Sequence, residues 1–147
     1  MKITICGSIA FYDEMLDVKK KLEALGHEVK VPPPMRTGEN GQPISSKDYY
    51  EIRHAAKPED TWVWEEKQRG ITDHFEKVAW SEAILVLNYD KNDIKNYIGP
   101  NTLMEMGLAL WLKKPVYLLN SIPKMQYMEE ICGLKPVVII GDLTKIR

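Results

Sequence analysis

The sequence predicts an α/β fold, a doubly wound flavodoxin- or Rossmann-like sheet of five parallel strands in the order 2-1-3-4-5. Strand-like and helical segments alternate along the 147 residues, and this alternation is typical of parallel sheets. Most of the strand-like segments are apolar throughout rather than alternating, as expected of strands buried on both faces. The length suits one core, so residues 1–147 are expected to form a single domain.

The expected strands are short apolar or β-branched runs that end at turn residues. The first strand runs into Gly7 and Ser8, and the second stops at three successive prolines. The last three are almost uninterrupted apolar runs, which indicates that they lie inside the sheet. In chain order, the strands are expected at 2–6, 28–31, 83–88, 115–119 and 136–140.

Apolar residues at helical spacing predict the elements between the strands. Gly26 is expected to end the first helix, and Ser45 or Ser46 to cap the second. Gly70 could divide the third, which is amphipathic, into two pieces. Helices are therefore expected over 12–25, from about 45 to 52, within 58–80, from about 101 and around 125–132.

Composition excludes several classes of function. A net charge of −1 gives no attraction to nucleic acid polymers or anionic membranes, and no apolar run reaches the length of a membrane span. The chain has neither a G-x-G-x-x-G fingerprint nor a Walker lysine, and its three histidines are scattered, so we expect no cofactor and no metal. Cys6 and Cys132 have no metal-ligand spacing, and no signal peptide precedes the first strand, so we expect a cytoplasmic protein with reduced thiols.

Glu105 is the most informative residue because it is the only charged side chain between Lys95 and Lys113. Its neighbours are apolar or glycine, so we expect its helix to be buried. A carboxylate in such surroundings costs free energy unless it is paired, protonated or in contact with a ligand. A purely structural carboxylate, held by a backbone group or an arginine, is the alternative.

Topology favours a functional role for Glu105. In a sheet of this order the ligand crevice lies outside the carboxyl ends of the strands, at the switch between strands 1 and 3. Residues 7–12, residues 88–101 and the start of the Glu105 helix should meet there. A buried carboxylate in a cleft suits acid–base or nucleophilic chemistry at a glycosidic carbon.

The turn after the first strand supplies further candidates, each with an alternative. Gly7 and Ser8 offer backbone N–H groups and a hydroxyl to an anion or a sugar, although Ser8 could simply cap a helix. The ring of Phe11 could stack on a ligand or pack in the core. The sequence leaves both choices open.

Other polar residues are expected near the same crevice. Asp73, His74 and Asp90 are the titratable ones, although Asp73 could lie on the solvent-exposed face of its helix. Asn101 and Thr102 precede Glu105, and capping of its helix would explain either of them.

Two segments resemble the nucleoside 2-deoxyribosyltransferase-like superfamily, which includes deoxynucleoside 5′-monophosphate N-glycosidases. They are Ile5-Cys-Gly-Ser-Ile-Ala-Phe11 and Pro100-Asn-Thr-Leu-Met-Glu-Met-Gly-Leu-Ala109. The second segment looks like the superfamily's Gly-Thr-x-x-Glu-x-Gly-x-Ala. With the spacing of strand 3, loop and helix, the resemblance covers most of the chain.

The resemblance implies that Glu105 attacks the anomeric carbon of a nucleoside or nucleotide and displaces the base, and that water or a second base resolves the glycosyl-enzyme. It implies that Gly7 and Ser8 line the sugar or phosphate site and that Phe11 packs on the base. It also implies a homodimer or a higher homo-oligomer. The full set of expected substrate-binding residues is Gly7, Ser8, Ile9, Phe11, Asp90, Gly99, Asn101 and Thr102.

The chain departs from the superfamily's pattern at three places. An aspartate is usual about nine residues before strand 3, where this chain has His74 preceded by Asp73, so either could be the acid or the group that orients the sugar. Ala10 stands where the monophosphate glycosidases carry an arginine, which argues against a 5′-phosphate. Residues 32–68 form an insert without an assigned counterpart, expected to begin as a loop over 32–42 and able to cover the crevice.

Two other functions compete with glycosidic cleavage or transfer. A non-catalytic nucleotide-binding or sensing module would fit the missing aspartate, but retention of a costly buried glutamate opposes it. A cytokinin-activating-type phosphoribohydrolase shares a Gly-Thr-x-x-Glu helix. Its Pro-Gly-Gly lead-in is absent here, which disfavours it.

Overall fold

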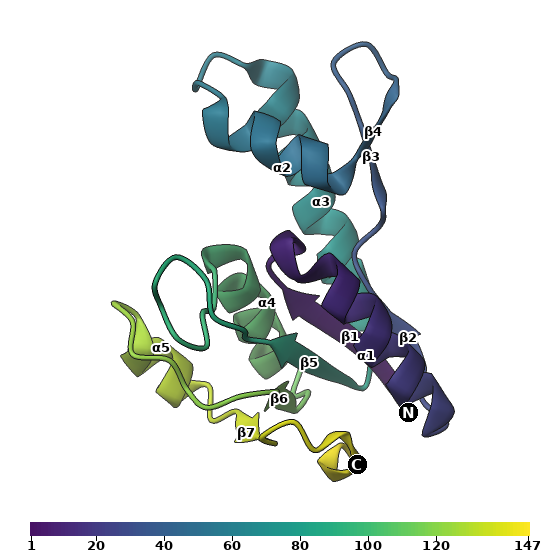
Figure 1. Cartoon of the computed structure of the whole chain (residues 1–147), viewed down its shortest axis with the longest axis vertical. Helices are drawn as coiled ribbons and strands as arrows, with labels where there is room; N and C mark the ends of the chain where they lie inside the picture. The colour runs from purple at the N-terminus through teal and green to yellow at the C-terminus, as the bar shows by residue number, and fades with distance from the viewer.

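The computed structural model describes residues 1–147 and contains one five-stranded parallel sheet, in the order β2-β1-β5-β6-β7 (Figure 1). Numbered among the sheet strands alone, this is the expected order 2-1-3-4-5, so the predicted α/β fold is confirmed. The strands are β1 (Lys2–Gly7), β2 (Glu28–Lys30), β5 (Ala83–Leu87), β6 (Val116–Leu118) and β7 (Val137–Val138).

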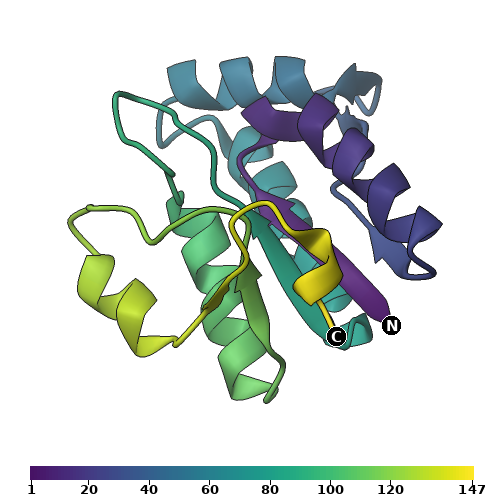
Figure 2. The ribbon, with the colours of Figure 1, turned by 60° about the horizontal axis from the view of Figure 1, so that its bottom comes forward.

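Helices cover both faces of this sheet, as Figure 2 shows. On one face α1 (Tyr12–Ala24) and the 3-10 helix η2 (Leu143–Lys145) pack on the sheet, and on the other lie α3 (Thr61–Trp80), α4 (Pro100–Trp111) and α5 (Met128–Gly133). Successive side chains of β1 and β5 point to opposite faces, so each strand contributes to both hydrophobic clusters. The β1 and β5 members of the first cluster are Ile3, Ile5, Ala83, Leu85 and Leu87, and those of the second are Cys6, Ile84 and Val86.

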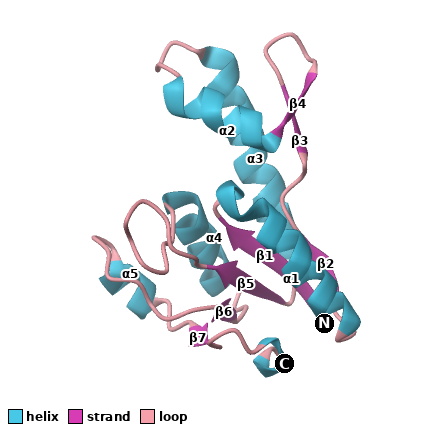
Figure 3. Cartoon of the chain, in the orientation of Figure 1, coloured by secondary structure: helices cyan, strands magenta, loops and turns pink.

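The insert folds into a hairpin and a helix that extend away from the sheet together with the first half of α3 (Figure 3). Strands β3 (Met35–Thr37) and β4 (Pro43–Ser45) pair antiparallel, so the expectation of a loop over 32–42 is wrong at β3. Ser45 caps α2 (Ser46–Ala55) by accepting from the backbone N–H of Asp48, which settles the choice left open between Ser45 and Ser46. The Tyr49 hydroxyl donates to the carbonyl of Val63 at 2.6 Å and ties α2 to α3.

Helix α3 continues unbroken through Gly70, so the expected division there is wrong. The reason for this glycine is a close approach: a Cβ at Gly70 would collide with the Arg36 guanidinium. Arg36 is held there by Glu66, whose carboxylate lies 2.9 Å from its Nε. Gly70 therefore lets β3 dock against the helix.

Helix α4 differs from expectation in two respects. Gly99 is its N-cap and Pro100 its first residue, so neither Asn101 nor Thr102 provides a side-chain cap. The helix is also only partly buried: Thr102, Glu105, Met106 and Ala109 face inward, but Trp111 is 82% exposed. None of the helices in the chain is long and apolar enough to cross a membrane.

Candidate active site

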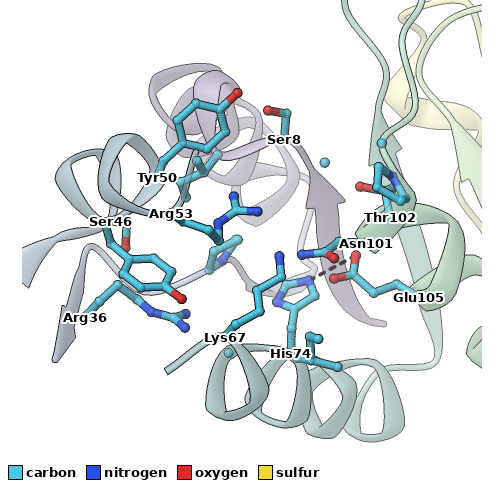
Figure 4. Close-up of a pocket in the computed structure, with 18 of the residues that line it drawn as sticks. Ser8, Arg36, Ser46, Tyr50, Arg53, Lys67, His74, Asn101, Thr102 and Glu105 are labelled. Atoms are coloured by element: carbon cyan, nitrogen blue, oxygen red, sulfur yellow. Dashed lines mark ion pairs between the residues drawn. The ribbon is translucent and has the colours of Figure 1, made fainter. Parts of the chain in front are cut away.

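A pocket of about 280 Å³ lies at the carboxyl ends of β1 and β5, between the sheet and the insert (Figure 4). Its lining comes from the turn after β1, from α2 and α3, from the loop after β5 and from the first turns of α4. This is the switch point at which parallel α/β sheets bind their ligands. Residues of the insert supply one wall of this pocket, opposite α4.

Nine of the residues expected at the site line this pocket. They come from three separate segments, which the topology brings together at one edge of the sheet. These residues are Gly7, Ser8, Ile9, Asp73, His74, Gly99, Asn101, Thr102 and Glu105.

Two expected residues, Phe11 and Asp90, lie outside the pocket. Phe11 is buried and meets Tyr89 edge-on, with 5.2 Å between the ring centroids, so it packs in the core rather than on a ligand. Asp90 is exposed and accepts a hydrogen bond from the backbone N–H of Asn96 at 2.9 Å, which shapes the loop after β5.

Glu105 projects from the second turn of α4 and is only 9% exposed. Burial raises the pKa of its carboxyl to about 8, while the Cys6 thiol and the Lys67 ammonium each lower that pKa in part. The carboxyl is therefore mostly protonated at neutral pH. Because little water reaches it, its charged form is poorly solvated and correspondingly reactive toward an electrophilic carbon.

His74 is the closest side chain on α3 to this carboxyl, with 3.9 Å between His74 Nε2 and Glu105 Oε2. Burial, and next the Lys77 ammonium, lower the pKa of His74 to about 4. The imidazole is therefore neutral at pH 7, and the ordinary pKa near 6.5 that would have suited an acid is lost. The Cys6 Sγ lies 3.4 Å from the same Nε2, so His74 is packed between a thiol and a carboxyl.

Asp73 lines the same pocket but is exposed, whereas His74 is buried. Consecutive residues of a helix point in different directions, which is why neighbours here occupy such different environments. Asp73 therefore offers a carboxylate that has access both to water and to the pocket.

Cys6, His74 and Glu105 are also the residues that could hold a metal ion. One donor atom from each lies within 4.8 Å of the others, and Cys, His and Glu are all zinc ligands. Burial raises the pKa of the Cys6 thiol, as does the nearby Glu105, so the thiol would have to lose a proton that its surroundings retain. The cluster is available to a metal, but a metal bound there would occupy the Glu105 carboxylate.

Several pocket residues were not expected from the sequence. The Ser8 hydroxyl caps the short 3-10 helix η1 (Ile9–Phe11) by accepting a hydrogen bond from the backbone N–H of Ala10. It also accepts a hydrogen bond from the Lys91 ammonium, at 2.8 Å. Charged residues on amphipathic segments normally lie in solvent, so only the expected places of residues 32–68 and 88–101 near the crevice pointed to them. The unexpected cations and tyrosines are Arg36, Tyr49, Tyr50, Arg53, Lys67, Lys91 and Tyr97.

Fold and pocket together define an α/β protein with a ligand site at the carboxyl edge of a doubly wound sheet. No protein-family model matches the sequence, and no curated protein matches it. Among solved structures, the chain is similar to the 2-deoxyribosyltransferase of the psychrotolerant bacterium Bacillus psychrosaccharolyticus. The two share 18% identity at a TM-score of 0.51, over 80% of this chain and 71% of that one.

The chain is also similar to the Clostridium botulinum CMP N-glycosidase BcmB, at 14% identity and a TM-score of 0.45, over 95% of this chain and 86% of that one. A TM-score this low carries no argument. The first similarity establishes the fold, and at that level it confirms the resemblance seen in the sequence.

Proposed function

We propose that this protein cleaves or transfers at the N-glycosidic bond of a nucleoside or nucleotide, with Glu105 as the nucleophile. The observation that carries the proposal is a single buried carboxyl with a pKa raised to about 8, in a pocket at the carboxyl edge of the sheet. The fold shared with a 2-deoxyribosyltransferase supports the same chemistry.

The reaction proceeds in two displacements. A Glu105 carboxylate oxygen bonds to the anomeric carbon as the C–N bond breaks, and the bonding electron pair leaves with the base, which takes up a proton. Water or a second base then attacks the same carbon and restores the carboxylate. Attack by water gives net hydrolysis, and attack by a second base gives transfer of the sugar.

Asp73 is the residue we assign to orienting the sugar or protonating the departing base. It lines the pocket and is exposed, whereas the neutral His74 has no proton to spare at pH 7. His74 instead packs beside Glu105 and keeps water away from it. Gly7, Ser8, Asn101 and Thr102 complete the pocket around the sugar.

The test is release of free base from a panel of nucleosides and their 5′-monophosphates, followed by chromatography. Glu105→Gln keeps the side-chain volume but cannot form the glycosyl bond, so we expect at least a roughly 1,000-fold loss of activity. Glu129→Gln, which changes an exposed carboxylate on α5 in the same way, is the matched control and should retain full activity. Full activity in Glu105→Gln would refute the assigned nucleophile.

The competing function is a non-catalytic nucleotide-binding module. It predicts binding without base release, with an affinity that Glu105→Ala leaves unchanged. Thermal stabilisation by the same panel, measured on both proteins, separates the two functions.

We also infer that the protein is a homodimer or a higher homo-oligomer, through the outer face of α4. Met104, Leu110 and Trp111 are 43%, 53% and 82% exposed there, and apolar side chains grouped on one helix indicate a contact surface. Light scattering after gel filtration should give at least twice the 17.0 kDa chain mass, and Trp111→Glu should reduce it to one chain. A wild-type mass of one chain would contradict this.

We propose that the protein acts in the cytoplasm. Both cysteines are free thiols, one of them exposed, and a reducing compartment preserves such thiols. Fractionation of the native host with an antibody to the chain tests this, and recovery outside the cytoplasmic fraction would contradict it.

A further inference from the structure

The pocket holds more positive charge than its own carboxylates balance. Four cationic side chains line it, and of these only Arg36 is in an ion pair, with Glu66. Lys91 is hydrogen bonded to the neutral Ser8 hydroxyl. Arg53 and Lys67 have no carboxylate within 4.0 Å, since none of the ion pairs in the chain includes either one.

Arg53 and Lys67 point into the same space. Figure 4 shows the Arg53 guanidinium, from α2, and the Lys67 ammonium, from α3, both directed into the cavity. Arg53 Nε is buried and has no hydrogen-bond partner. Two cations that face one space without a counter-ion raise the free energy of the empty pocket, and a bound anion would lower it.

The ionisation of Lys67 reflects this arrangement. Burial, and then the charges of Arg53 and Arg36 in that order, lower the pKa of its ammonium to about 8. The nearby Glu105 acts in the opposite direction but lies beyond ion-pair distance. Lys67 is thus a cation whose proton would be held more tightly once an anion is bound.

A structural role explains only part of the Arg53 geometry. Its guanidinium carbon lies 5.3 Å from the centre of the Tyr50 ring, a cation–π contact. That contact uses no N–H donor, and the Arg53 Nε has no hydrogen-bond partner. Such donors match the oxygens of a phosphate, which a guanidinium binds in bidentate fashion.

We propose that Arg53 and Lys67 bind the phosphate group of the substrate, so that the protein acts on nucleoside monophosphates rather than on nucleosides. The inference rests on the proposed function, because it places the phosphate at the insert wall and the anomeric carbon at Glu105, across the same cavity. It also assigns a role to the insert: with Ala10 in place of an arginine, residues 46–68 supply the missing positive charge from another direction.

The experiment compares base release from each nucleoside with that from its 5′-monophosphate. We expect kcat/KM to be about 100-fold higher for the phosphorylated substrate, and Arg53→Met and Lys67→Met each to lower that value about 10- to 100-fold. Activity on the unphosphorylated nucleoside should fall less than activity on the monophosphate in both variants. Some fall is expected in Lys67→Met, because its ammonium also lowers the pKa of Glu105. Lys67→Arg, which keeps the charge, should retain most of the preference.

Lys47→Met is the matched control. It removes one positive charge from α2, but Lys47 is exposed and pairs with Asp13 outside the pocket, so both substrates should react as with the wild type. Equal rates on nucleoside and monophosphate, or an equal loss on both in Arg53→Met and Lys67→Met, would overturn the phosphate assignment while leaving glycosidic activity intact.

If no compound releases base, binding measurements test the phosphate site on their own. Thermal stabilisation of Glu105→Gln by deoxyribose 5-phosphate and by the monophosphates, lost on adding Arg53→Met, would support the phosphate site although the proposed function had failed. No stabilisation would overturn the site. Stabilisation by inorganic phosphate alone, equal to that by the nucleotides, would show a free-anion site and would also overturn the substrate assignment.

Discussion

The two walls of the pocket come from different parts of the fold and differ in chemistry. The sheet wall, with Asp73, His74 and Glu105, is built on α4 and the second half of α3, against β1. The insert wall, with Arg36, Arg53 and Lys67, is built on the hairpin, α2 and the first half of α3. Burial governs the sheet wall, where it raises the pKa of Glu105 and lowers that of His74, so both side chains are mostly uncharged at pH 7.

The insert wall differs in charge, because it carries the Arg36 and Arg53 guanidinium groups and the Lys67 ammonium. In the proposed function, the sheet wall therefore determines the reactivity of the site, and the insert wall determines the charge of the ligand that binds. The variants and conditions below test whether the two walls contribute to the reaction independently or together.

Asp73→Asn should have the largest effect among changes that leave the nucleophile in place. Loss of a carboxylate that orients the sugar or protonates the base costs about 100-fold in kcat, with little change in KM. Steady-state kinetics on the best substrate of the panel measures this. A change confined to KM would move Asp73 from the chemistry to binding.

The pH dependence of the rate should reflect the ionisation of Glu105 on the sheet wall and of Lys67 on the insert wall. Glu105 must be ionised to attack, and its pKa is about 8, so the rate should rise about 50-fold between pH 6 and pH 8. Above pH 8 Lys67 loses its proton, so kcat/KM should fall again for monophosphates but level off for nucleosides. A flat profile from pH 5 to pH 9 would contradict the role of Glu105.

Glu105→Gln should stabilise the protein at neutral pH. The folded-state pKa of about 8 lies above the ordinary value of 4.5, so the unfolded chain ionises first and stability falls as pH rises from 4.5 through 8. The variant escapes that loss and should gain about 3 kcal/mol at pH 7, with little difference at pH 4.

Urea denaturation at the two pH values measures the difference. His74, with a pKa lowered to about 4, costs stability as pH falls from 6.5 through 4. That loss occurs in both proteins and cancels in the comparison. A wild type more stable than the variant at pH 7 would mean that Glu105 is a paired, structural carboxylate.

Tyr49→Phe should loosen the insert wall alone. The buried hydroxyl donates to the Val63 carbonyl, and its removal loses this hydrogen bond between α2 and α3, at a cost of about 1 kcal/mol. Urea denaturation gives the loss of stability, and KM should rise more for monophosphates than for nucleosides. An equal rise for both would indicate that the insert holds the whole ligand.

Chelation should have no effect. Because the proposed nucleophile is Glu105 rather than a metal-bound water, base release in excess EDTA should equal that in buffer, and added Zn²⁺ should inhibit by occupying Cys6, His74 and Glu105. Loss of activity in EDTA, restored by zinc, would make those three residues metal ligands.

Much of the fold could be predicted because its signals are local. The apolar run at 83–88 marks a strand covered on both faces, and the sheet order follows from parallel strands joined by helices. The misses have tertiary causes. Gly70 looks like a helix breaker, but it is required by the approach of Arg36, a contact between residues 34 positions apart.

The candidate site divides in the same way. Glu105 could be found because a lone charge in an apolar helix is visible without any structure. Phe11 could not be assigned, since a turn after a strand can aim a ring at a ligand or at the core, and only its contact with Tyr89 decides.

The sequence by itself determined the α/β class, the strand order and the burial of the Glu105 carboxyl, because hydrophobic patterning acts locally along the chain. Tertiary structure alone decided the protonation of His74 and the grouping of Arg53 with Lys67. A pKa depends on burial and on charges brought near by folding, and the direction of an insert depends on what it packs against. These quantities belong to the folded pocket rather than to any segment of the chain.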